Sequence, residues 1–97
     1  KSEEVRRRIS QYVKNSKSFW IGIASNGENG CRQRWNGKYK ELGMKHMLAV
    51  YQTNSDSFRK QMEDDLIKFY GDRCDNIRGG GGGPIGNPPY SVYIVWA

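Results

Sequence analysis

The placement of three strand-like segments among helical ones constrains the fold of this 97-residue chain most strongly. Aromatic and β-branched residues typical of strands fill three segments: 18–24, 47–53 and 90–96. Apolar residues recur at helical spacing in three others: 3–14, 31–42 and 58–70. Three strands form a stable small sheet when helices cover it. The sequence therefore predicts a single α+β domain over residues 1–97, with a three-stranded antiparallel sheet and flanking helices.

The segment 58–70 carries the strongest helix signal. Asn54–Ser57 offers several N-cap candidates, and Gly71 suits the position after the last turn. We expect its apolar face to be formed by Phe58, Met62, Leu66, Phe69 and Tyr70. In the stretch 31–42 we expect Trp35, Tyr39 and Leu42 to share a face, although Gly37 weakens that helix.

The remaining segments define the outline of the domain. Residues 1–15 form an extra N-terminal helix in this interpretation, with Val5, Ile9, Tyr12 and Val13 on one face. Residues 25–30 are rich in Asn and Gly and predict a loop. The run 79–89 contains five consecutive glycines and then several prolines, which predicts a flexible loop before the last strand.

The net charge of +6, from sixteen Lys and Arg against ten Asp and Glu, favours polyanionic partners such as nucleic acid, anionic lipid or a heparin-like sugar. A basic soluble domain with no such partner is the plain alternative. No run of 18 apolar residues occurs, so a membrane span is not expected. Cys31 and Cys74 are either free thiols or one disulfide, and with His46 as the sole histidine they do not make a usual zinc set.

Two residues are candidates for phosphate chemistry. Glu63 lies at the margin of the apolar stripe of its helix, where a partly desolvated carboxylate would suit Mg²⁺. The alternative is an exposed Glu paired with Arg59 or Lys60. Arg34 has a guanidinium that can hold two phosphate oxygens, with Arg32 as its competitor, and both are otherwise solvent-exposed charges.

Other basic and glycine-rich features also have simple structural interpretations. Arg6, Arg7 and Arg8 fan around the first helix, either as a solvated face or as phosphate contacts. Gly79–Gly83 lacks the Lys-Ser or Lys-Thr ending of a phosphate loop and precedes a strand, so a flexible linker is favoured. We expect His46 to be a structural or surface residue.

Three segments in one order resemble the core of the GIY-YIG nucleases. They are Trp20-Ile21-Gly22 at a strand end, Arg34-Trp35 in the next helix, and Glu63-Asp64-Asp65-Leu66-Ile67-Lys68 in a later helix, with Asn76 beyond it. The last of these resembles the Glu helix of the bacterial excision-repair nuclease branch. The resemblance covers roughly residues 19–96. It implies a metal-dependent endonuclease that hydrolyses phosphodiester bonds in DNA, with RNA as the alternative substrate, and that uses Mg²⁺ or Mn²⁺.

The first strand of that family has no counterpart before Trp20. Ser91-Val92-Tyr93, near the C-terminus, is similar to its Gly-Ile-Tyr motif. The resemblance therefore implies a circular permutation in which this strand has moved to the chain end and pairs beside residues 19–24.

By the same analogy, each candidate residue acquires a role. Tyr93 would help to deprotonate the attacking water, Arg34 would bind the scissile phosphate, and Glu63 would hold the cation. Asn76 would orient the site, and Lys38 or Tyr39 would complete it. The arginines of the first helix, with Arg32, would add phosphate affinity.

One departure from the family pattern leaves other functions open. Trp20 stands where the second motif has Tyr, and an indole cannot accept a proton or ionise as a phenol can. A non-catalytic nucleic-acid-binding module on the same fold is therefore one alternative. A basic interaction domain of a larger protein, which meets an acidic partner or a glycan, is another.

Overall fold

The computed structural model describes residues 2–16, 19–71 and 86–97. The elements in chain order are α1 (Ser2–Val13), β1 (Phe19–Ala24), α2 (Gly27–Arg34), the π-helical turn η1 (Trp35–Tyr39), β2 (His46–Thr53), α3 (Asp56–Tyr70) and β3 (Tyr90–Trp96). The expected α+β class is confirmed. No helix in this described part of the chain is long and apolar enough to cross a membrane.

The three strands form one antiparallel sheet in the order β1-β3-β2. The last strand of the chain is therefore the central one, and it pairs with β1 so that Gly22 lies opposite Tyr93. This confirms the expected pairing of residues 90–96 with residues 19–24. A β-bulge between Ala49 and Tyr51 interrupts the pairing of β2 with β3.

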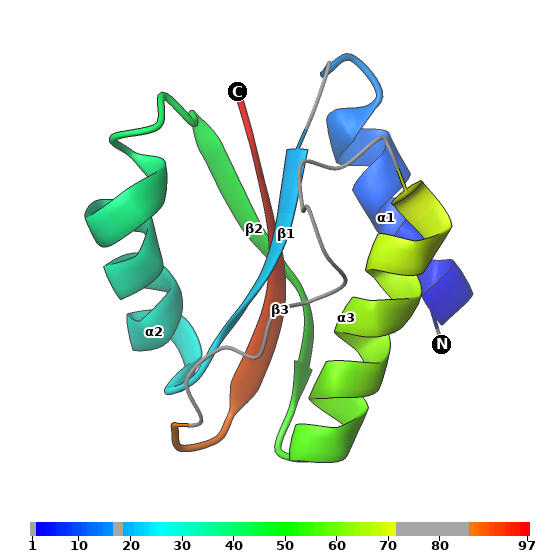
Figure 1. Ribbon diagram of the computed structural model, residues 1–97, viewed down its shortest axis with the longest axis vertical. Coiled ribbons are helices and arrows are strands. Elements are labelled where there is room, and N and C mark those ends of the chain that lie inside the picture. Colours follow the sequence, from blue (N-terminus) through cyan, green and yellow to red (C-terminus); the bar gives the residue numbers. More distant parts are fainter. Residues whose placement is uncertain (1, 17–18, 72–85) are drawn as a thin grey trace.

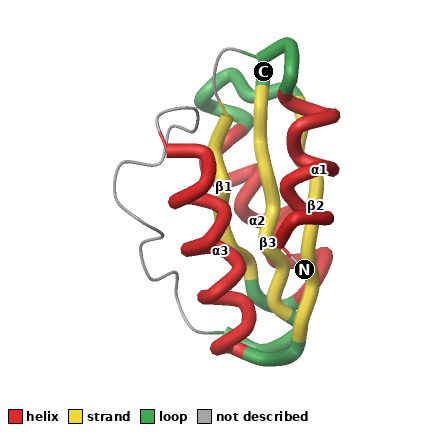
Figure 2. Tube along the Cα trace, turned by 90° about the vertical axis from the view of Figure 1, so that its right-hand side faces the viewer, coloured by secondary structure: helices red, strands yellow, loops and turns green. Residues whose placement is uncertain are grey.

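Helices cover both faces of the sheet (Figure 1). α2 and η1 lie on one face, and α1 and α3 lie on the other. Viewed from the α1/α3 side, α3 runs along the β1 side of the sheet and α1 along the β2 side (Figure 2). The ends of α1 and β3 and the starts of β1 and β2 gather at one end of the molecule.

Each face of the sheet has its own core. The larger one, under α1 and α3, is built from Val5, Ile9, Val13, Phe19, Ile21, Val50, Met62, Leu66, Ile67, Tyr70, Val92 and Ile94. The smaller one, under α2 and η1, contains Ala24, Tyr39, Tyr93 and Val95. Because side chains alternate along β3, Val92 and Ile94 enter the first core while Tyr93 and Val95 enter the second.

Both ends of α3 follow from local chemistry. Ser55 is the N-cap, and its hydroxyl accepts a hydrogen bond from the Phe58 amide at 3.3 Å. Gly71 has a positive φ of 53° at the C-terminal end, a conformation that glycine adopts easily. The helix limits expected from Asn54–Ser57 and from Gly71 are confirmed.

Three details differ from the expectation. The segment 27–30 is helical and opens α2, although its Asn and Gly content predicted a loop. Leu42 is 53% exposed, because the chain after η1 is a turn and no longer a helix. The buried stripes of α1 and α3 are narrower than expected, because Tyr12 is 48% exposed and Phe58 and Phe69 are 53% and 55% exposed. Asn76, Cys74 and most of the expected 79–89 loop lie outside the described residues.

Candidate functional site

Two buried tyrosines form the centre of the candidate site. The hydroxyls of Tyr39, from η1, and Tyr93, from β3, are 2.9 Å apart and share a hydrogen bond. Their rings meet edge to face with centroids 5.7 Å apart. Burial, reinforced by the hydrogen bond to Tyr39, holds the pKa of Tyr93 well above its ordinary value. Tyr93 is therefore a neutral phenol near pH 7.

The π-helical turn places Tyr39 on this face. The Lys40 amide donates to the Trp35 carbonyl at 3.0 Å, five residues back, so the turn holds one residue more than an α-helical turn. Arg34 and Tyr39, five residues apart, consequently lie one above the other as residues four apart do in an α-helix. This geometry brings the basic and phenolic groups to the same side of the sheet.

Gly22 is the reason that Tyr93 reaches the edge of the sheet. A Cβ atom at Gly22 would lie 2.7 Å from one ring carbon of Tyr93, and nearer still to its hydroxyl oxygen. The Tyr93 ring thus lies across Gly22, which belongs to the edge strand β1. Only a residue without a side chain leaves this space open.

Arg34 lies beside the tyrosine pair. It is half-buried, and its positive charge lowers the pKa of Tyr93, although burial outweighs that effect. Arg34 also lines a cavity of about 360 Å³ at the end of β1, together with Ser25, Asn26 and Gln33. A guanidinium next to three short polar side chains is suited to an anion such as a phosphate.

Lys38 and Trp20 border the pair on the solvent side. The Lys38 ammonium nitrogen lies 5.5 Å from the centre of the Trp20 ring and 5.3 Å from that of Tyr39. Trp20 is half-buried against the smaller core. The expected residues Tyr93, Arg34, Trp20, Lys38 and Tyr39 are therefore gathered on the α2 side of the sheet.

Glu63 occupies the other side. It lies on α3, is only 4% exposed, and forms no hydrogen bond or ion pair with another described residue. Burial raises the pKa of its carboxyl to about 7, against the opposing positive charge of Arg59. Arg59 pairs with Asp56 instead. Glu63 therefore does not fit the alternative interpretation, in which it is an exposed residue paired with Arg59.

The sheet therefore separates Glu63 from Arg34 and the tyrosine pair, and no direct contact joins them among the described residues. What the two sets share is the β1 edge. Tyr93 reaches this edge at Gly22 from one face, and α3 packs along β1 on the other (Figures 1 and 2).

Among the described residues, Glu63 is the buried carboxylate that a metal ion would bind. Within residues 2–16, 19–71 and 86–97, no three His, Cys, Asp or Glu side chains come together. Mg²⁺ takes one or two carboxylates and keeps several waters, so a multi-ligand cage is not required. A buried carboxylate without a described partner, as at Glu63, fits such a cation.

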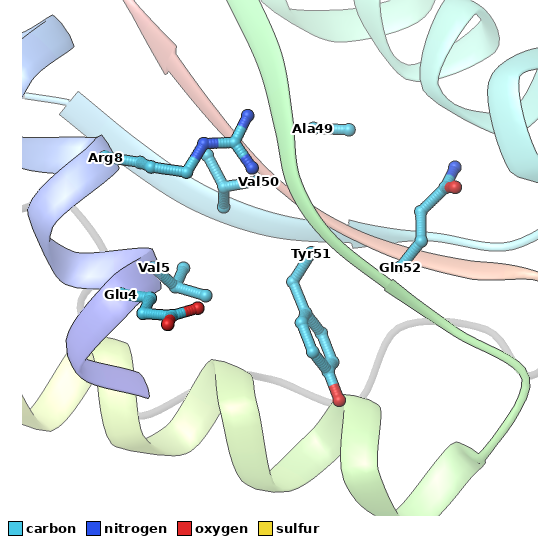
Figure 3. Close-up of a pocket in the computed structure, with 7 residues that line it drawn as sticks. All are labelled: Glu4, Val5, Arg8, Ala49, Val50, Tyr51 and Gln52. Atoms are coloured by element: carbon cyan, nitrogen blue, oxygen red, sulfur yellow. The ribbon is translucent and has the colours of Figure 1, made fainter. Parts of the chain in front are cut away.

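The other arginines lie in three different places. Arg6 stacks over the Phe69 ring at 4.2 Å and lies 3.9 Å from Glu3, while Arg7 lines the hollow between α1 and α3. Arg8 lies in a groove between α1 and β2 (Figure 3). Arg32 is exposed and pairs with Glu28 at 3.3 Å. Only Arg34 of the five expected arginines lies at the tyrosine pair.

Several residues of the site were missed by reasoning from the sequence. Ser25, Asn26 and Gln33 line the Arg34 cavity, and their only signal is their position directly after a strand or beside Arg34. Ser91 is fully buried beside Cys31 and accepts a hydrogen bond from the Gln52 amide at 3.2 Å. Burial raises the pKa of the Cys31 thiol, which forms no disulfide with a described residue.

Comparison with known proteins identifies no relative of this chain. Neither a protein-family model, nor a curated protein, nor a solved structure matches the chain.

Proposed function

We propose that this domain is a divalent-metal-dependent endonuclease that hydrolyses phosphodiester bonds in nucleic acid, with the β1 edge as its cutting site. The observation that carries the proposal is the packing of the tyrosine pair across Gly22, with Arg34 beside it. Arg34 and the tyrosine pair approach this edge from the α2 side, and α3 packs along the same strand with Glu63 buried on it. The net charge of +6 suits the polyanionic substrate.

Each residue has a physical role in this proposal. Arg34 binds the phosphate and stabilises the charge that grows on its oxygens as the water oxygen bonds to phosphorus and the sugar oxygen leaves. Glu63 would hold the cation, Mg²⁺ or Mn²⁺, and the cation would supply positive charge to the leaving oxygen. Lys38 adds a second positive charge beside Trp20.

The role of Tyr93 changes from the one that the family resemblance implies. Because its raised pKa keeps the phenol protonated, Tyr93 orients a water molecule by hydrogen bonding and does not remove its proton as a phenolate. The proton of the attacking water passes to solvent, and solvent protonates the leaving sugar oxygen. Tyr39 fixes the direction of that hydroxyl through the 2.9 Å hydrogen bond. Asn76, which would complete the family pattern, lies outside the described residues.

The likeness to a permuted GIY-YIG nuclease is part of the proposal. Its structural support is the central place of β3, which carries Ser91-Val92-Tyr93 and pairs with the strand that carries Trp20-Ile21-Gly22. Pairing of antiparallel neighbours depends on their position in space, so moving a strand to the chain end preserves the sheet.

The test is nicking of a supercoiled plasmid with Mg²⁺ or Mn²⁺. The proposal predicts nicking that EDTA abolishes and that Arg34→Gln reduces by about 100-fold or more, which is the scale of one lost transition-state contact. Arg32→Gln removes the same charge two residues away and should keep the activity. An absence of nicking under all metal conditions contradicts the proposal.

A non-catalytic nucleic-acid-binding module is the second candidate. It is favoured by one specific feature, namely that both site hydroxyls are buried and satisfy each other, while Trp20 replaces the expected phenol. This candidate predicts salt-dependent retention of DNA without metal-dependent cleavage. The plasmid assay, read beside a gel-shift series in rising salt, separates the two candidates.

A further inference from the structure

The groove between α1 and β2 lies on the opposite edge of the sheet from the candidate cutting site. Its cavity of about 530 Å³ is lined by Glu4, Val5 and Arg8 of α1 and by the bulged stretch 49–52 of β2 (Figure 3). β2 is the second edge strand of the sheet, so one side of its backbone also faces this groove. We call this feature the α1–β2 groove.

Arg8 provides the positive charge of the groove. Its side chain extends from α1 toward Val50 of β2 (Figure 3). It forms no ion pair with any described residue, including Glu4 one turn earlier. An exposed guanidinium without a partner in a groove is suited to a phosphate oxygen.

Three aromatic rings from three different elements lie at one end of this groove. Tyr12, one turn after Arg8 on the same side of α1, has its ring centroid 5.7 Å from that of Trp96 at the end of β3. His46, the first residue of β2, stacks on Trp96 with centroids 5.0 Å apart and an angle of 26°. Tyr12 is 48% exposed and His46 is exposed, so this ring cluster remains open to solvent.

The surroundings of the ring cluster are basic. The flanking stretches 12–16 and 44–47 contain Lys14 and Lys45 and no Asp or Glu. The Lys45 amide donates to the Trp96 carbonyl at 3.0 Å, which fixes that lysine beside the ring cluster. Open rings beside free positive charge are the combination that binds unpaired nucleotides, since bases stack on the rings and cations follow the backbone.

We propose that the α1–β2 groove binds an unpaired single strand of nucleic acid, with a base stacked on the His46–Trp96–Tyr12 cluster and a phosphate on Arg8. Four helical residues separate Arg8 from Tyr12, a rise of about 6 Å. The inference rests on the proposed function in that its ligand is nucleic acid, and it specifies the substrate class as nucleic acid with an unpaired strand that binds at the edge of the sheet opposite the cutting site.

Fluorescence anisotropy with a labelled 20-nucleotide oligo-dT and a labelled 20-base-pair duplex, both in EDTA, tests the groove. We expect Tyr12→Leu and His46→Ala to weaken oligo-dT binding by about fivefold or more, the scale of one lost stacking contact. Arg8→Gln should reduce the slope of log K against log salt by about 0.7, which is one phosphate contact on a single strand. Duplex binding should change less in all three variants.

Two controls lie on α3, away from the groove. Lys68→Gln removes one exposed positive charge, and Phe69→Leu removes an aromatic ring as exposed as Tyr12. Both should bind oligo-dT as the wild type does, and circular dichroism should show that every variant is folded.

The outcomes separate the groove from the proposed function. Equal oligo-dT affinity in the wild type and all groove variants overturns the groove proposal. Binding of duplex alone, together with plasmid nicking, also overturns it and leaves the endonuclease proposal standing. Binding of neither probe overturns both.

Discussion

Replacement of Gly22 by Ala is the sharpest structural perturbation of the candidate site. The added Cβ would lie 2.7 Å from a ring carbon of Tyr93, whereas ordinary contacts begin at 3.4 Å. Tyr93 is almost fully buried and cannot swing outward, so the contact must be relieved by movement of β1 or by a strained ring. Overpacking of this kind costs about 1–3 kcal/mol.

A second cost follows if the Tyr93 ring shifts. Its hydrogen bond to Tyr39 would be lost, and a buried hydroxyl without a partner costs about 1–3 kcal/mol. We therefore expect Gly22→Ala to lower the free energy of unfolding by about 2–6 kcal/mol in total. A loss of about 2 kcal/mol, the lower end of this range, lowers the melting temperature of a chain of this length by roughly 8–16 °C.

Thermal unfolding followed by circular dichroism measures this effect, with Gly37→Ala as the matched control. Nothing lies within 4 Å of a Cβ at Gly37, which is in the helical turn η1. That variant should be unchanged or more stable by up to about 1 kcal/mol, because Ala is the better helix former. A Gly22→Ala protein that melts with the wild type would refute the packing of Tyr93 across β1.

Three further predictions concern stability. Tyr39→Phe should lower the free energy of unfolding by about 1–3 kcal/mol, because it leaves the Tyr93 hydroxyl unpaired. Adding Tyr93→Phe should recover much of that loss, which a double-mutant cycle in urea will measure. Folding raises the pKa of Glu63 from 4.5 to about 7, so the contribution of the protonated carboxyl is full below pH 4.5 and is lost as the pH rises through 7. Glu63→Gln should therefore have a higher urea midpoint than the wild type at pH 8, with the difference fading toward pH 5, and equal midpoints at pH 8 would contradict this. Ser55→Ala should cost about 1 kcal/mol through the lost N-cap of α3, measurable in the same urea series.

Much of the fold follows from local sequence signals. The limits of α3 depend on a hydroxyl at Ser55 and a glycine at Gly71, and both effects act within one turn of the helix. The segment 90–96 is recognisable as a strand from its composition, and its burial on both faces explains its almost unbroken apolar run. Its pairing with residues 19–24 was predicted from a family resemblance, not from composition, and its central place was not predicted.

The local departures have physical causes that the sequence does not display. Residues 27–30 are helical although they contain two glycines, because hydrogen bonds to the segment before β3 hold the start of this helix. The backbone amides of Asn26 and Gly27 donate to the carbonyls of Asn87 and Pro89. These partners are some sixty residues away in the chain, so no local propensity reports them. The extra residue of η1 likewise has no signal in the sequence, yet it places Tyr39 and Arg34 on the same face.

The candidate site was predictable residue by residue but not in its layout. Arg34, Tyr39 and Tyr93 could be named from motif order, and the structure gathers them on one face. The position of Glu63 across the sheet depends on which face α3 covers, and a helical wheel does not contain that information. The role of Gly22 as the opening for Tyr93 likewise required the β1–β3 register.

The most direct test of the account is metal-dependent plasmid cleavage by Glu63→Gln beside Asp64→Asn. The two carboxylates are neighbours on α3, but Glu63 is buried and Asp64 is exposed. The account predicts that Glu63→Gln abolishes nicking while Asp64→Asn nicks as the wild type does. Wild-type nicking that survives Glu63→Gln unchanged would contradict the central claim that this edge of the sheet holds the cation for cleavage.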